Sequence, residues 1–430
     1  MPRKRRKSPS NVRVALPVRG KRRSRRRIQM RRSAVVATAL LVFILFLTLS
    51  PQPASEGNDH GGCFWCGHFA LADAILNLLV FLPIGFLLAL RHRGSPVRTW
   101  ASLTALAVAI ELTQLFLPGR FATLSDVLMN SSGAAIGIGL ARLWKRGPTL
   151  RMAESGRLTI LAGAAAACVT LGSTLLLQAS LPESMWFGQW TPDLGHYEQY
   201  DGEVLEARIG EVPIPSRRLD DSPAVRTRLQ HGDPLVISFV AGPLPLGVAP
   251  VFSIYDGMER EILVLGVRDQ DLVFRLRRRA SDWRFRSPEA LYPGAGTTEG
   301  DTALVRLVVR DRSTCLEIPD GDCIPLATPG RGWSLLLGAA PAQNAEHVAD
   351  FVWLGLLFVP VGYSLRRRRT AAVGLAISLV GLLGASLLGG AMTGTDWLVT
   401  GLGPVLGVIG GVWAGRTLAP DFSEVQWLAR

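Results

Sequence analysis

The most constraining feature of this chain is a series of long apolar runs. A helix that crosses about 30 Å of hydrocarbon needs about 20 mostly apolar residues. Eight stretches are long enough once their flanks are included: residues 33–50, 74–90, 99–119, 127–141, 158–182, 351–365, 370–395 and 397–415. No such stretch lies between residues 183 and 348. The sequence therefore predicts a multi-pass α-helical membrane protein with eight spans and one large domain outside the bilayer.

The excess positive charge belongs to one end of the chain. Hydrophobic residues make up 48% and charged residues 19%, which is too apolar for an ordinary soluble enzyme. The formal net charge is +13, but 15 of the 47 Lys and Arg residues lie in residues 1–32, which hold no acid. The rest has 32 basic against 34 acidic residues. Beside a first span, such an arm fixes orientation and contacts anionic lipid headgroups. Nucleic-acid-binding arms share this composition, but we expect no nucleic-acid partner.

The Lys and Arg residues of the short connections predict the orientation. Cytoplasmic loops of membrane proteins carry an excess of these residues. The basic connections all fall on one side: the N-terminal arm, 91–98, 142–157, 366–369 and the tail. Both termini are then cytoplasmic, and residues 183–348 are extracytoplasmic. A cleaved signal peptide is the alternative for the first span, although a 32-residue basic region is long for one.

These boundaries divide the chain into six parts. They are a basic cytoplasmic arm (1–32), a first four-span unit (33–146), a fifth span (157–182), an extracytoplasmic domain (183–348), three further spans (349–417) and a cytoplasmic tail (418–430).

An internal repeat relates the two hydrophobic halves. Asp, Phe, Pro and Gly recur at equal offsets in 73–85 and 350–362, and the spacing of Asp126, Gly133 and Gly137 recurs at Asp396, Gly403 and Gly407. Both copies run in the same direction, which favours a parallel 4+4 duplication. Chance apolar similarity is the alternative.

The second copy lacks the polar side chains of the first. Leu354 replaces Asn77, Thr400 replaces Asn130, and Gly381 stands at the offset of Glu111. A working polar site is therefore expected in the first copy.

Seven polar residues of the first copy are predicted to meet at the outer half of the bilayer: Asp73, Asn77, Glu111, Gln114, Arg120, Asp126 and Asn130. An ionisable side chain inside hydrocarbon costs at least about 2.5–3.5 kcal/mol, so Glu111 needs a partner such as Arg120 or a wet cavity. Three interpretations remain open. The cluster is a ligand pocket, or a structural network with Gly133 and Gly137 as a close-packing surface, or a catalytic site in which Glu111 or Asp126 acts as acid or base.

These residues form a pattern that resembles the VanZ-like family of bacterial membrane proteins over residues 71–144. The pattern is Asn77-x3-Phe81-x-Pro83-x-Gly85, then Glu111-x2-Gln114, then Arg120-x5-Asp126-x3-Asn130-x2-Gly133-x3-Gly137. The resemblance implies a multi-pass envelope protein from a family named for low-level resistance to the glycopeptide teicoplanin. Its molecular activity is not established. The chain departs from a minimal member through its duplicate half and its inserted domain.

The inserted domain has the alternating pattern of β-strands. We expect strands at 235–240, 251–255, 261–267, 272–277, 303–309, 314–318 and 333–337, with hairpin turns at 268–271 and 310–313. Antiparallel strands over this length suggest an all-β sandwich or jelly roll. Residues 200–340 resemble a concanavalin A-like or laminin G-like domain, which implies glycan or protein binding. Such domains often hold calcium, but no clear acidic calcium loop is present.

Aromatic residues precede the predicted strands, namely Trp186, Trp190, Tyr197 and Tyr200. They could stack on sugars or serve as packing residues.

Two cysteine pairs are candidate disulfides. Cys315 and Cys323 flank a short loop on the oxidising side of the membrane, which favours a bond. Cys63 and Cys66 lie in a Cys-x-x-Cys-Gly-His sequence that misses the haem attachment motif by one residue. A disulfide, free thiols and metal or redox chemistry remain alternatives for that pair. We expect neither a cofactor nor a metal.

The leading functional hypothesis is non-catalytic recognition of a cell-wall glycan, glycopeptide or lipid-linked precursor, with membrane lipids as partners. An intramembrane enzyme that uses Glu111 and Asp126 is the second hypothesis, and a transporter built on the repeat is the third.

Overall fold

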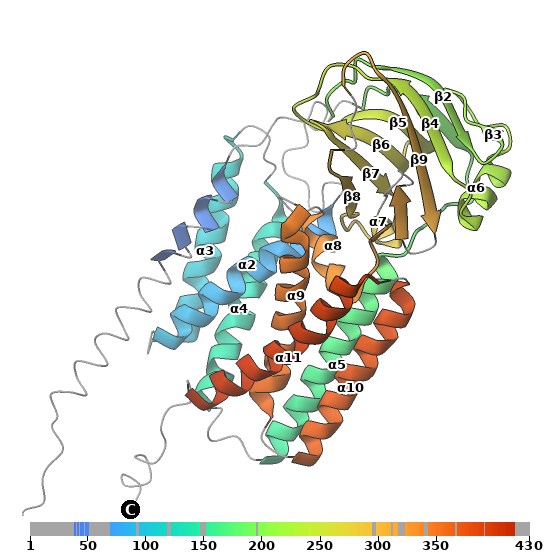
Figure 1. Cartoon of the computed structure of the whole chain (residues 1–430). Coiled ribbons are helices and arrows are strands. Elements are labelled where there is room, and N and C mark those ends of the chain that lie inside the picture. Colours follow the sequence, from blue (N-terminus) through green and yellow to red (C-terminus); the bar gives the residue numbers. More distant parts are fainter. Residues whose placement is uncertain are drawn as a thin grey trace, which may run out of the picture.

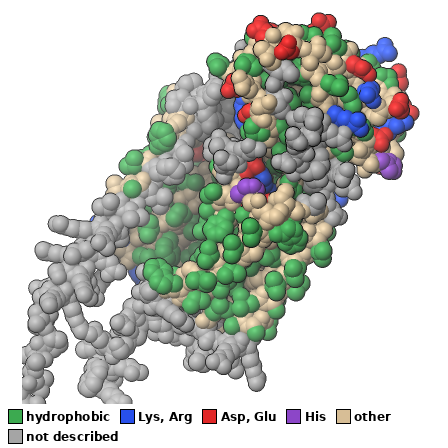
Figure 2. All heavy atoms as spheres, viewed as in Figure 1, with side chains coloured by type: hydrophobic (Ala, Val, Ile, Leu, Met, Phe, Trp, Pro, Cys, Tyr) green, Lys and Arg blue, Asp and Glu red, His purple; other side chains and the backbone are tan. Residues whose placement is uncertain are grey.

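The computed structural model joins a helical part to a β domain at one end of the helices (Figure 1). It describes residues 38–39, 41–42, 44–46, 48–50, 69–91, 94–117, 122–146, 152–194, 197–294, 298–310, 313–316, 323–338, 343–365, 368–390 and 392–417. Hydrophobic side chains cover the visible face of the helices, whereas acidic and basic side chains gather on the β domain (Figure 2).

Seven long helices are described: α2 (Ala70–Arg91), α3 (Pro96–Gln114), α4 (Leu124–Arg146), α5 (Met152–Leu176), α9 (Gln343–Ser364), α10 (Arg368–Gly389) and α11 (Gly394–Thr417). Five of them, namely α2, α5, α9, α10 and α11, are long and apolar enough to cross a membrane. The predicted spans at 99–119 and 127–141 correspond to α3 and α4, which are less apolar and pack beside α2. The described residues of the first predicted span include the buried Ile44, which belongs to one hydrophobic cluster with residues of α2, α3 and α4.

Glycines bring the helices together in pairs. α2 packs against α4, and a Cβ at Gly133 or Gly137 would overlap the carbonyl oxygen of Leu78 or Leu82 on α2. In the other half, Gly407 and Gly411 of α11 approach α9 in the same way. Pro83 lies inside α2. A Cβ at Gly85 of α2 would likewise overlap the backbone of Ala134 on α4. Close approach of backbones through small residues is the common way that helices associate in lipid.

The third pair is α5 with α10. Gly381 of α10 lies so close to Ala167 of α5 that a Cβ would overlap it. At the offset where the first half has Glu111, the second half therefore has a packing glycine.

The β domain is a sandwich of two antiparallel sheets. One sheet has the order β1-β5-β6-β7-β8, and the other has the order β11-β10-β9-β4-β2-β3. The strands are β1 (Trp186–Trp190), β2 (Glu203–Ile209), β3 (Val212–Pro213), β4 (Leu235–Val240), β5 (Ala249–Asp256), β6 (Glu261–Arg268), β7 (Asp271–Leu276), β8 (Glu289–Tyr292), β9 (Thr302–Arg310), β10 (Ser313–Leu316) and β11 (Cys323–Pro325). Their inward side chains form one core.

The predicted hairpins are present, but one predicted strand is wrong. β6 pairs with β7 and β9 pairs with β10, across the turns expected at 268–271 and 310–313. Residues 333–337 are not a strand. The chain there forms a 3-10 helix, η2 (Pro329–Trp333), followed by α8 (Ser334–Leu337). This segment packs against α2, α5, α9, α10 and α11, and Leu335 also packs with Ala280 of α7 (Arg279–Asp282), so its apolar residues lie between the helices and the β domain.

The aromatic residues proposed as sugar contacts are largely structural. Trp186 is fully buried and Tyr200 is 3% exposed, both within the sandwich core. Trp190 packs on that core, and its indole nitrogen donates to the Ile214 carbonyl at 3.0 Å. The side chains of Trp186 and Tyr200 are therefore not free to stack on a ligand, and that of Trp190 is partly buried.

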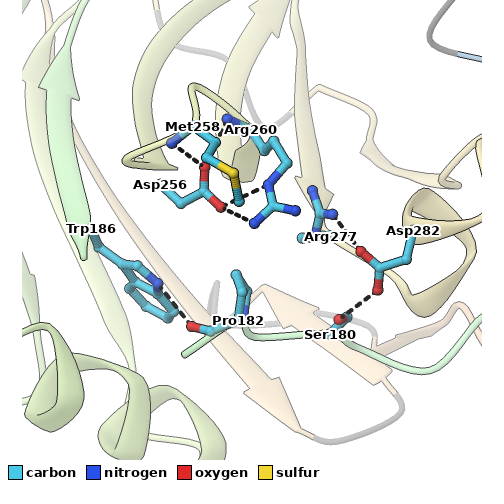
Figure 3. A network of polar contacts seen from close by, with 8 residues as sticks. All are labelled: Ser180, Pro182, Trp186, Asp256, Met258, Arg260, Arg277 and Asp282. Atoms are coloured by element: carbon cyan, nitrogen blue, oxygen red, sulfur yellow. Dashed lines mark hydrogen bonds and ion pairs between the residues drawn. The ribbon is translucent and has the colours of Figure 1, made fainter. Parts of the chain in front are cut away.

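The chain enters the β domain through a network of polar contacts (Figure 3). Asp282 accepts hydrogen bonds from Arg277 at 2.6 Å and from Ser180 at 3.4 Å, which ties the entry segment to the end of β7. Further along, Arg260 donates twice to Asp256, at 2.9 and 2.7 Å. Burial alone would raise the pKa of Asp256, but these bonds and the amides of Met258 and Arg260 hold the pKa below its usual value. The turn between β5 and β6 is therefore fixed.

Cys315 and Cys323 lie directly opposite each other in the β10–β11 ladder. A disulfide there is expected to stabilise the domain by about 2–3 kcal/mol in the loop-entropy model. Reduction should lower the melting temperature of the purified protein, and thiol labelling under denaturing conditions should detect both cysteines only after reduction. Labelling of both without reduction would show that they are unpaired. Cys63 and Cys66 lie outside the described residues.

Candidate functional site

The polar residues of α2, α3 and α4 gather at the end of the helices nearest the β domain. Thr123 immediately precedes α4 and caps it, since its hydroxyl accepts from the Asp126 amide at 3.2 Å. The Asp126 side chain bonds to Thr123 and also to Asn77 of α2. The predicted juxtaposition of Asn77 and Asp126 therefore arises from the cap of one helix facing the first turns of another.

Glu111 completes this cap from α3. Its side chain is 7% exposed, and its Oε2 accepts from the backbone amide of Thr123 at 3.0 Å. In the second half, the Thr393 amide is bound instead by Asp396 of its own helix, at 2.9 Å. Because Glu111 takes the cap amide, Asp126 is available for Asn77. Arg120, the predicted partner of Glu111, lies outside the described residues.

Gln114 binds a different partner. It is 7% exposed, and its amide nitrogen donates to the Thr48 carbonyl at 2.8 Å. It therefore holds α3 to the segment that precedes α2, which is a structural role.

Asn130 differs from Gln114 because a polar atom of its side chain is buried without a hydrogen-bond partner among the described residues. It lies one turn after Asp126 on α4 and is 2% exposed. Its Oδ1 atom has no hydrogen-bond partner in the described part of the chain. Such buried, unpaired acceptors are rare in folded proteins and call for a specific explanation.

Asp73 connects the first half to the β domain. Its Oδ1 pairs with Arg286 at 2.8 Å, and the same guanidinium donates to the Leu336 carbonyl at 2.6 Å. It also lies over the ring of Phe69, 5.1 Å from its centre. Asp73 therefore acts as an anchor for the β domain, at the edge of the cluster.

The second half has its own buried charges, which sequence reasoning missed. Arg331 of η2 is 3% exposed and contacts Glu346 at 2.6 Å and Asp350 at 3.3 Å. Asp350 also accepts from the Trp333 indole at 2.5 Å. Asp350 was visible in the repeat, but Arg331 comes from the far end of the inserted domain. The second half is therefore not devoid of polar residues; its acids bind an arginine of the chain itself.

His347, Asp350 and Asp396 place ligand atoms within 4.8 Å of one another, so their spacing could suit a metal ion. However, Trp333 and Arg331 occupy both oxygens of Asp350, and Thr393 donates twice to Asp396 Oδ2. We interpret this group as a buried ion-pair network.

Within the described residues, the two halves differ in the partners of their acidic side chains. In the second half, a guanidinium lies between the carboxylates. In the first half, neither Glu111 nor Asp126 contacts a cationic side chain within the described residues. The first cluster is thus rich in acceptors and suits a ligand that donates hydrogen bonds.

Comparison with known proteins supports a membrane role for this unit. Residues 23–145 match the family model described as VanZ/LLP1. No curated protein and no solved structure gives a match. The match covers the segments that carry Asn77, Glu111, Asp126 and Asn130, and it ends before the β domain. Residues 23–145 are therefore similar to the VanZ/LLP1 family, and the chain combines this unit with further helices long and apolar enough to cross a membrane and with a β-sandwich domain.

Proposed function

We propose that the VanZ-like unit binds the headgroup of a lipid-linked cell-envelope molecule at the outer leaflet. The binding residues are Asn77, Glu111, Asp126 and Asn130. We also propose that the β domain is extracytoplasmic and that both termini are cytoplasmic. The positions of three basic residues support this orientation. Arg91 ends α2, Arg98 lies in the first turn of α3 and Arg142 lies in the last turns of α4, and these helix ends are remote from the β domain (Figure 1).

The unpaired Oδ1 of Asn130 carries this proposal. A buried acceptor without a donor costs about 1–3 kcal/mol, so the fold alone gains nothing from an amide at this position. A hydroxyl, amide or ammonium group of a ligand would satisfy it. Asp126 lies one turn away and Glu111 lies beside the same cap, so one headgroup could bond to several acceptors.

The acidic character of the cluster narrows the ligand. Carboxylates repel phosphate and other anions, whereas they accept from hydroxyl and ammonium groups. A sugar or peptide headgroup of a lipid-linked cell-wall precursor has such donors. Binding of a precursor of this kind would connect the protein to glycopeptide resistance, which the family resemblance implies.

The organisation of the two halves supports a 4+4 repeat of eight spans. In each half a proline-containing helix, α2 or α9, packs through glycines against a helix capped by Thr-x-x-Asp, α4 or α11. We infer that the first copy kept an open binding cluster while the second copy became a binding surface for η2.

Asn130→Leu provides the sharpest test. Removing this buried acceptor is expected to lower the melting temperature little or not at all, since the Oδ1 atom has no hydrogen bond to lose within the described residues. Native mass spectrometry of full-length protein extracted from its own membranes should detect a lipid-linked adduct on the wild type and at least about tenfold less on the variant, equivalent to about 1.4 kcal/mol.

Glu111→Gln and Thr400→Val complete this test. The glutamine introduced at position 111 can still accept from the Thr123 amide, so folding should persist while adduct retention falls. Thr400 stands at the offset of Asn130 in the second half, and it is also buried. Its replacement by valine should leave the adduct in place. A wild-type protein without an adduct, or an Asn130→Leu protein that retains it fully, would contradict the proposal.

A further inference from the structure

A second candidate site lies on the β domain, far from the membrane cluster in sequence. It is a pocket of about 370 Å³ on the five-stranded sheet, lined by Gln189, Asp193, Leu194, Ser253, Ile254, Tyr255, Glu259, Glu261 and Val264. This volume lies at the small end of the range for ligand sites, about 300–1,000 Å³. It would hold a ligand of monosaccharide or disaccharide size.

The floor of the pocket is the face of the sheet opposite the core. Phe252 and Ile254 are fully buried in the sandwich core, so Ser253 between them belongs to the other face. Gln189 of β1 and Val264 of β6 are its partners in the ladder and form a row across the sheet. Ser253 is 2% exposed, and its hydroxyl has no hydrogen-bond partner in the described part of the chain.

Strained backbone flanks the pocket. Four non-glycine residues in the described part of the chain have positive φ, and two of them border this site: Thr191 at 41° and Glu259 at 58°. A left-handed conformation is costly for a β-branched residue such as threonine. Residues of this kind cluster at ligand sites, where the surrounding structure fixes them. The Asp256–Arg260 contacts hold the turn that presents Glu259 (Figure 3).

The charges around the pocket select against anionic ligands. Its lining includes three carboxylates, those of Asp193, Glu259 and Glu261, and no lysine or arginine. The nearby Arg275 is already paired with Glu261 at 3.4 Å and with Glu289. Phosphates, sulfates and uronic acids would therefore be repelled. A calcium ion is a poorer fit, because these three carboxylates are not among the described groups whose ligand atoms lie within 4.8 Å of one another.

The remaining lining suits a sugar with an acetamido group. Carboxylates accept from sugar hydroxyls, while the Gln189 amide and the Ser253 hydroxyl can bond to an amide. Leu194 and Val264 provide an apolar wall for a methyl group. Tyr255 adds an aromatic surface, held by stacking on Phe187 at 5.3 Å between ring centres. We propose that this pocket binds an electrically neutral sugar of the N-acetylhexosamine type. The proposal goes beyond the membrane site, because it concerns a separate domain and needs no lipid.

The test is saturation-transfer NMR on the full-length protein in a detergent that has no sugar headgroup. The probes are N,N′-diacetylchitobiose, which is neutral, and digalacturonate, which is anionic. Saturation transfer to the acetyl methyl groups of the first is expected, and none to the second. Gln189→Leu combined with Glu259→Gln removes two polar contacts on different segments and should weaken binding at least about tenfold.

Glu211→Gln is the matched control, because Glu211 is an exposed acid in the turn between β2 and β3, away from the pocket. It should bind the disaccharide like the wild type. Absence of transfer to diacetylchitobiose, preference for digalacturonate, or unchanged binding by a folded double variant would overturn the proposal. Adduct retention at Asn130 is measured separately, so either proposal can fail without the other.

Discussion

Replacing Arg331 by methionine is expected to lower the free energy of unfolding by about 3–5 kcal/mol, because the change leaves buried acids without their cation. The Arg331 side chain is 4% exposed, and its partners Asp350 and Glu346 are 2% and 15% exposed. Thermal unfolding of the full-length protein, followed by near-ultraviolet circular dichroism, should show a large decrease in melting temperature.

A triple variant and an exposed pair control this prediction. Arg331→Met with Glu346→Gln and Asp350→Asn should recover most of the loss, because no uncompensated charge remains and the asparagine oxygen at position 350 still accepts from Trp333. Arg226→Met removes an arginine that lies 3.8 Å from a largely exposed Glu183 and should change stability by less than about 1 kcal/mol. A single variant as stable as the wild type would show that Arg331 is not the counterion we infer.

Gly133→Ala should destabilise the protein by about 1–3 kcal/mol, since a Cβ at this position overlaps the Leu78 carbonyl and α4 must move away from α2. The same substitution at Gly139, on the same helix, meets no atom within 4 Å. It should be neutral or stabilise the helix by up to about 1 kcal/mol.

The opposite signs of these two alanine substitutions are the measurable result. Guanidine or sodium dodecyl sulfate unfolding of both variants in the same detergent would compare them directly. Equal effects at the two positions would mean that α2 and α4 are not in close backbone contact.

The helices are predictable because lipid imposes a simple rule on sequence: a spanning segment must be long and apolar. Residues 333–337 are too short for that rule to apply. A short apolar run fits a buried strand or a buried helix equally well, and its neighbours in space decide between them. Here Gly332 lets the backbone approach the side chain of Trp353, because an added Cβ at Gly332 would lie only 2.6 Å from the Trp353 indole nitrogen. Residues 333–337 then pack on helices.

The sequence predicts which residues form the candidate membrane site, but it does not predict their hydrogen-bond partners. Spacing places Asn77, Asp126 and Asn130 at helix starts that face one another. It cannot show that Glu111 binds the backbone amide of Thr123, because main-chain partners leave no trace in a residue pattern. The sequence also does not predict the ion pair between Arg331 of η2 and Asp350 of α9, because the position of η2 depends on where the chain leaves the β domain. The carbohydrate pocket likewise depends on the register of β1 with β5.

The placement of η2 has a consequence for biogenesis. This segment leaves the ribosome before α9, α10 and α11, yet it lies among them with Arg331 buried. The last three helices must therefore assemble around a segment that directly follows the β domain in the chain and was synthesised before them. Folding of the β domain would then act as a checkpoint, because a chain whose β domain has not folded would leave Glu346 and Asp350 without their counterion.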